Sequence, residues 1–194
     1  MTTTKKLYCD GVYVCDYESN DDLDDDQMAV IQILKQRGLH KEVTLEQSIF
    51  RQAVSFGTTA AYLWERDLNR VPRQGISIAP FVVNATFALE LYLKSISLLH
   101  GSKIHGHDLV DLFDSLKADA RQSLASAFQF AKWPCDVKDL DQYRAALLKI
   151  RKAFVEWRYL HEGNPSSPID FPSLIFMMEV AHEACNRHPV IQAA

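Results

Sequence analysis

Arg158 and His161 are the two side chains whose types and spacing best suit a chemical role. They lie three residues apart in a segment with helical periodicity, so both side chains leave the same face of a helix. A histidine can take a proton as a general base, and a neighbouring guanidinium can stabilise negative charge that develops on a phosphate. Arg158 and His161 are therefore candidate catalytic residues.

A second charged pair, Glu90 and Lys94, interrupts an otherwise apolar stretch of the chain. The two residues are four apart with the glutamate first, which is the favourable orientation for a helix ion pair. A buried Glu90 needs a cation, and we predict Arg158 as its partner because a guanidinium can hold a carboxylate through two hydrogen bonds. We prefer this structural network to catalysis as the explanation of Glu90 and Lys94.

Arginines at positions 144, 151 and 158 recur every seven residues, which predicts one basic stripe along a helix with about 10 Å between neighbours. Such a stripe can follow RNA phosphates, so Arg144 and Arg151 are candidate RNA-binding residues. Pairing with acidic residues of a second copy, or an ordinary solvated helix face, explains the stripe equally well. A second basic cluster consists of Arg66, Arg70 and Arg73.

Two polar segments invite a metal-binding interpretation, which we do not favour. His100, His105 and His107 have separations that match no standard zinc site, and Asp108 suits the cap of a helix. The five aspartates within residues 21–26 lack the glycine and terminal glutamate of an EF-hand loop, and they suit the start of a helix. We expect neither a metal nor another cofactor.

Composition predicts a helical domain. The 194 residues are 47% hydrophobic, and the 7 Gly and 7 Pro are too few for a turn-rich all-β chain. The formal net charge of −4 excludes a general electrostatic attraction to nucleic acid, so any such contact must come from a local patch. Four separated cysteines, and no apolar run behind the N-terminal lysines, predict a cytoplasmic protein.

The apolar periodicity predicts an all-α bundle with a short N-terminal β-hairpin at Asp10-Gly11. Residues 1–43 are expected to form an N-terminal extension with this hairpin and one helix, and residues 44–188 the bundle. Ile78–Leu99 is long enough to span a membrane, but its polar residues are costly in hydrocarbon, so we expect a buried central helix and no membrane association. Other helices are predicted from Thr44 to about Leu68, from about Asp139 to Glu162, and from Asp170 onward. Between Leu99 and Asp139, we expect one short helix that begins at Asp108 and another that ends at about Phe130.

Three segments, in this order, resemble prokaryotic HEPN-like domains. They are Asn84-Ala-Thr-Phe-Ala-Leu-Glu-Leu-Tyr-Leu-Lys, Gly106-His-Asp-Leu-Val-Asp-Leu-Phe and Phe154-Val-Glu-Trp-Arg-Tyr-Leu-His-Glu. The resemblance covers about residues 45–188 and implies an up-and-down helical bundle that often forms a homodimer. It also implies a range of roles, which includes RNA-cleaving toxins, defence effectors and non-catalytic domains that bind RNA or a cognate protein partner.

The chain departs from the HEPN catalytic pattern, in which four to six residues separate an arginine from a histidine. Only two residues separate Arg158 from His161, and nine separate Arg151 from His161. A contracted Arg158–His161 site predicts metal-independent cleavage of RNA. A pairing of Arg158 with Glu90 predicts none, and this is the outcome we expect for the isolated protein.

The leading hypothesis is a HEPN-like intracellular protein of a defence or toxin–antitoxin type system that acts on or through RNA. The alternative is a non-enzymatic homodimeric interaction module in which Glu90, Lys94 and Arg158 only hold the bundle together. Solvent access separates the two hypotheses. A cleft shared by Arg158 and His161 favours the enzyme, and burial of Arg158 against Glu90 favours the module.

Overall fold

The computed structural model describes residues 2–159 and 168–193, and it shows a mainly helical protein with one short antiparallel sheet. The prediction of a mainly α-helical fold is therefore confirmed. The chain divides into two compact units, Met1–Val43 and Thr44–Ala194. The expected catalytic residue His161 lies outside the described residues, as does the end of the helix predicted up to Glu162.

The first unit is a β-hairpin followed by one helix. Strands β1 (Thr3–Cys9) and β2 (Val12–Ser19) pair antiparallel, and helix α1 spans Leu23–Gln36. Asp10 and Gly11 both have positive φ angles, which is why this dipeptide closes the hairpin as predicted. The aspartates lie at the start of α1, as predicted. The side chain of Asp22 caps the helix by accepting hydrogen bonds from the backbone N–H groups of its first turn.

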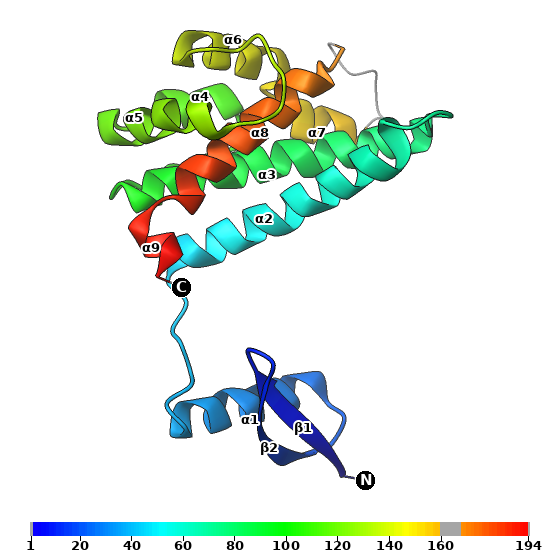
Figure 1. Ribbon diagram of the computed structural model, residues 1–194, viewed down its shortest axis with the longest axis vertical. Coiled ribbons are helices and arrows are strands. Elements are labelled where there is room, and N and C mark those ends of the chain that lie inside the picture. The colour runs from blue at the N-terminus through cyan, green and yellow to red at the C-terminus, as the bar shows by residue number, and fades with distance from the viewer. Residues whose placement is uncertain (1, 160–167, 194) are drawn as a thin grey trace. The chain divides into compact units, whose positions relative to one another are not determined.

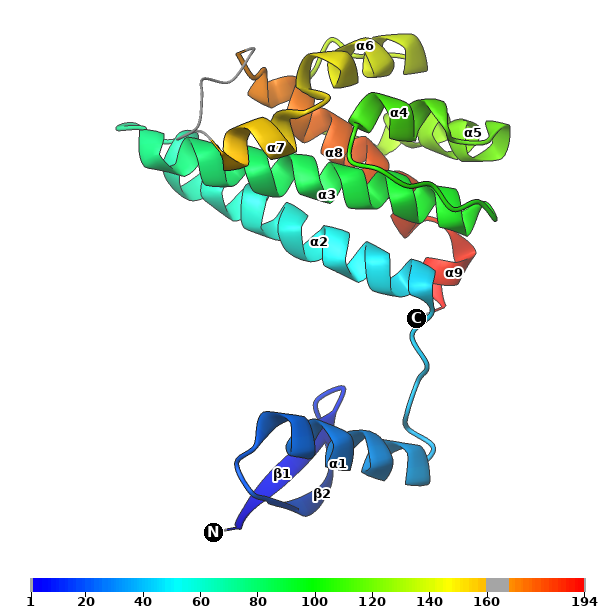
Figure 2. The ribbon, with the colours of Figure 1, turned by 180° about the vertical axis from the view of Figure 1, so that it is seen from behind.

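The second unit is a bundle built around the long helices α2 (Leu45–Leu63) and α3 (Ile78–Leu99), which run side by side (Figures 1 and 2). Helix α8 (Phe171–Asn186) also packs on α3. The remaining helices are α4 (Leu109–Asp114), α5 (Ala118–Ala127), α6 (Leu140–Ile150), α7 (Ala153–Arg158) and α9 (Pro189–Gln192). Short turns of helix follow α2 at Trp64–Leu68, precede α3 at Gly75–Ser77 and follow α5 at Phe128–Phe130.

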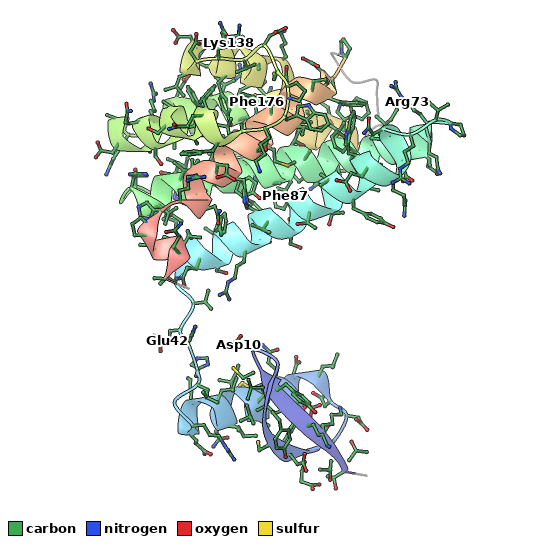
Figure 3. The ribbon with its side chains drawn as sticks, in the orientation of Figure 1. Asp10, Glu42, Arg73, Phe87, Lys138 and Phe176 are labelled. Carbon is green, nitrogen blue, oxygen red and sulfur yellow. The ribbon has the colours of Figure 1, made fainter. Side chains whose placement is uncertain are left out.

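Helix α3 is the centre of the bundle. Within the described residues, only the segment Gly75–Leu99 is long and apolar enough to cross a membrane, and 61% of its most apolar window is buried inside the protein. This burial fits the core helix of a soluble protein, as the sequence predicts. Phe87 of α3, labelled in Figure 3, links α3 to two neighbouring helices. Its ring contacts that of Phe56 of α2 and stacks on that of Phe154 of α7.

The single helix predicted from about Asp139 to Glu162 is wrong. Arg151 still has helical dihedral angles, but Lys152 does not, with φ of −116° and ψ of 9°, so α6 and α7 are separate helices. The physical reason is a tertiary hydrogen bond in which the Leu109 N–H donates to the Arg151 carbonyl, 3.3 Å away. This contact ties the start of α4 to the break, and the predicted basic stripe therefore does not run along one continuous helix.

A partly buried pair of titratable groups lies beside the core, Tyr92 of α3 and His182 of α8, with 3.1 Å between Tyr92 Oη and His182 Nδ1. Burial raises the pKa of Tyr92 and lowers the pKa of His182, so both side chains are neutral near neutral pH.

The lowered pKa of His182 predicts that stability falls in mild acid. Below about pH 6.5 the histidine of the unfolded chain takes up a proton before the buried one does, so the unfolded state binds more protons and gains stability. The free energy of unfolding should be smaller at about pH 5.5 than at about pH 7.5. Urea titrations at both pH values should show a smaller drop in the free energy of unfolding for His182→Gln than for the wild type. An equal drop would show that His182 does not cause the loss of stability in acid.

Candidate functional site

The candidate site lies on the side of α3 that carries Glu90 and Lys94. These residues are one helical turn apart and point from the same face of α3. The side chain of Glu90 is only 1% exposed and that of Lys94 is 20% exposed, so a full carboxylate is held inside the bundle. Burial of this kind is costly unless the charge is paired.

Glu90 uses a single oxygen to hold two basic side chains. Lys94 Nζ donates to Glu90 Oε1 at 2.7 Å, and His107 Nδ1 lies 3.0 Å from the same oxygen. The other oxygen, Oε2, is buried and makes no hydrogen bond among the described residues. Such an unsatisfied buried acceptor is uncommon and marks a group whose position is not explained by stability alone.

His107 contacts both the buried carboxylate and the solvent. Its Nδ1 atom lies against the buried Glu90, whereas 65% of its side chain is exposed. Its neighbours in the chain hold it in place. Gly106 adopts a φ of +107°, and Asp108 caps α4 by accepting from the backbone N–H groups of Val110 and Asp111. The predicted role of Asp108 as a helix cap is confirmed.

The ion pair with Lys94 indicates that Glu90 is ionised, so the carboxylate accepts and His107 Nδ1 carries the donated proton. This tautomer leaves the Nε2 atom of a neutral His107 as a proton acceptor. The arrangement is a histidine oriented by a buried carboxylate, which is the pairing that proteins use for general acid–base chemistry. Lys94 adds a positive charge at the same place.

The expected ion pair between Glu90 and Arg158 is wrong. Arg158 is exposed, and its guanidinium carbon lies 5.1 Å from the centre of the Phe154 ring and 4.7 Å from that of Tyr159. These are cation–π contacts, which hold Arg158 against α7 instead of against α3. Lys94 is four residues from Glu90 on the same helix and supplies the buried cation that the sequence analysis assigned to Arg158.

The two predicted RNA-binding arginines both bind carboxylates of α4 or its cap. Arg144 holds Asp114 through two hydrogen bonds and keeps the pKa of Asp114 below its usual value. Arg151 Nε donates to Asp108 at 2.7 Å. Both arginines therefore fasten α4 to the α6–α7 segment, and an RNA phosphate would compete with these carboxylates for them.

Sequence reasoning missed His107 as a site residue and treated it as part of a polar loop. Its partner Glu90 is 17 residues away in the chain, so no helical spacing links the two. The available signal was the need of a buried Glu90 for basic partners, together with a histidine beside a predicted helix cap. Within the described residues, no group of three or more His, Cys, Asp or Glu side chains is placed to hold a metal ion.

Comparisons of the chain with protein-family models, with curated proteins and with solved structures found no match.

Proposed function

We propose that this chain is a HEPN-like domain that cleaves RNA without a metal ion, with His107 as the residue that transfers the proton. The observation that carries the proposal is the exposed His107 held by the buried Glu90, with Lys94 on the same carboxylate oxygen. An exposed imidazole with a fixed tautomer and a neighbouring cation are the two groups that this reaction requires.

The proposed step uses the 2′-hydroxyl of RNA as the nucleophile. Neutral His107 takes the hydroxyl proton on Nε2, and the 2′ oxygen then attacks the adjacent phosphorus. The bond from phosphorus to the 5′ oxygen breaks, and this oxygen takes a proton from water. Lys94 stabilises the negative charge that builds up on the phosphate oxygens, and the products carry a 2′,3′-cyclic phosphate and a 5′-hydroxyl.

The meeting of the three HEPN-like segments supports this proposal. Glu90 and Lys94 come from the first segment, and His107 comes from the second. The third segment begins at Phe154, which stacks on Phe87 of the first, with 4.8 Å between the ring centres. Residues that resemble one family in sequence thus also lie together in space, although Phe87 and Phe154 are 67 positions apart.

The resemblance also supports a proposal about the compartment, the oligomeric state and the biological system of the protein. We propose a cytoplasmic homodimer in a defence or toxin–antitoxin type system, with a cognate protein partner that restrains the cleavage. The rival function is a non-enzymatic homodimeric interaction module. It is favoured by the ion pairs of Arg144 and Arg151, because these pairs give both arginines a purely structural role.

Cleavage in the presence of a chelator tests the proposal and separates it from its rival. The 194-residue chain should cut a single-stranded RNA in EDTA and leave a DNA of the same sequence intact, because DNA lacks the 2′-hydroxyl. Intact RNA would favour the interaction module. Cleavage of both nucleic acids, or cleavage that stops on chelation, would contradict the mechanism.

A further inference from the structure

A cavity of about 400 Å³ lies on the opposite side of α3 from the Glu90 cluster. Tyr92 of α3 lines this cavity and follows Glu90 by two residues, which places it about 200° around the helix from Glu90. Residues of α2, of the helical turn Trp64–Leu68, of α8 and of the segment before α6 complete the walls. The volume is that of a typical small-molecule site, and the cavity shares no residue with the proposed RNA site.

Aromatic rings form much of the cavity wall. The rings of Trp64 and Trp133 meet nearly at right angles, with 5.7 Å between their centres, and Phe81 lies 5.7 Å from Trp64. The faces of such rings carry partial negative charge, and indole attracts a cation more strongly than the other aromatic side chains do. Trp64, Trp133 and Phe81 all line the cavity, so a cationic group held there lies next to two indole side chains and a phenyl ring.

The charges that line the cavity also favour a cation. Its charged side chains are the carboxylates of Glu65 and Glu179 and the ammonium of Lys132. The two remaining titratable groups are Tyr92 and His182, and both are neutral near neutral pH because burial shifts their pKa values. Glu179 is held in position by the backbone N–H of Trp133, which donates to it at 2.9 Å. The lining thus carries a net negative charge.

A glycine keeps part of this space open. Gly57 lies in the middle of α2, where glycine weakens a helix relative to alanine. A Cβ atom at this position would lie only 3.2 Å from Tyr92 Oη and 3.6 Å from Met178 Sδ. The absence of a side chain at Gly57 therefore leaves Tyr92 and Met178 in place at the cavity.

We propose that this cavity binds a small organic cation with a quaternary ammonium head, held by cation–π contact with Trp64 and Trp133 and by the charge of Glu179. The apolar wall accepts the methyl groups of such a head, and the carboxylate offsets its charge. A neutral molecule of the same shape gains the apolar contact alone. An anion is repelled by Glu65 and Glu179, and only Lys132 attracts it.

The test compares the binding of a cation and of a neutral molecule of the same shape to the 194-residue chain. Choline and 3,3-dimethylbutan-1-ol have the same shape and differ in charge. Titration calorimetry and tryptophan fluorescence should show at least a tenfold tighter binding of choline, and benzyltrimethylammonium should bind as well. Glu179→Gln and the exposed Glu65→Gln should each weaken choline binding, while Trp157→Phe, outside the cavity, should not.

Three results would overturn the proposal. Equal binding of choline and its neutral analogue would show an apolar pocket without preference for a cation, and tighter binding of a carboxylate ligand would show an anion site. Absence of binding by both choline and benzyltrimethylammonium would show that the cavity takes no such ligand. Because Glu65 is exposed, its variant should fold normally even where Glu179→Gln does not, and circular dichroism checks this.

Discussion

Replacement of His107 by alanine is expected to lower RNA cleavage by roughly 100- to 10,000-fold, which is the usual contribution of a general base. The melting temperature should change little, because the side chain is 65% exposed and removes little packing when it is lost. Single-turnover cleavage of a labelled RNA in EDTA measures the first effect, and thermal unfolding measures the second.

His105→Ala is the matched control, because His105 is an exposed histidine in the same loop. This variant should cut RNA at the wild-type rate. A His107→Ala protein that keeps full activity would contradict the assignment. If cleavage were lost in His161→Ala instead, the Arg158–His161 site inferred from the sequence spacing would be restored.

Glu90→Ala is expected to lower the free energy of unfolding by about 3 kcal/mol, as is usual when one partner of a buried ion pair is removed. The change leaves the largely buried Lys94 ammonium without its carboxylate. It also opens a void in the core of the bundle beside α3. Glu90→Gln keeps the volume, so it should cost less stability. It should still lower cleavage, because an amide does not carry the charge that fixes the His107 tautomer.

Urea unfolding of both Glu90 variants measures this effect. Asp136→Ala is the control, since Asp136 is an exposed carboxylate in the loop before α6. Its unfolding midpoint should match that of the wild type. If Glu90→Ala unfolds at the same urea concentration as the wild type, the pairing of Glu90 with Lys94 makes no net contribution to stability.

Local signals in the sequence predicted the local structure well. Ile78–Leu99 is a helix over the predicted range, and the helix predicted from Thr44 begins there with a capping box between Thr44 and Gln47. The Asp10-Gly11 dipeptide closes the hairpin. Each of these features depends on residues within a few positions of one another, where helix caps, turn geometry and apolar spacing act.

Features that depend on distant contacts were not predictable from spacing. The helix predicted from about Asp139 to Glu162 breaks after Arg151, whose carbonyl accepts a hydrogen bond from Leu109 of another helix. The Glu90–Lys94 pair follows from a four-residue spacing, whereas His107 reaches Glu90 only through the fold. The prediction that Arg158 pairs with Glu90 rested on charge alone. In the structure the guanidinium of Arg158 lies over the rings of Phe154 and Tyr159 instead.

The most direct test of the central claim, that His107 activates the 2′-hydroxyl of RNA, is to identify the product ends on a substrate with one reactive position. The substrate is a DNA strand that contains a single ribonucleotide, and its control carries a 2′-O-methyl group at that position. We expect one cut, a 2′,3′-cyclic phosphate in the mass spectrum, an intact 2′-O-methyl strand and no product with His107→Ala. Products that carry a 5′-phosphate, or cleavage of the 2′-O-methyl strand, would contradict the claim.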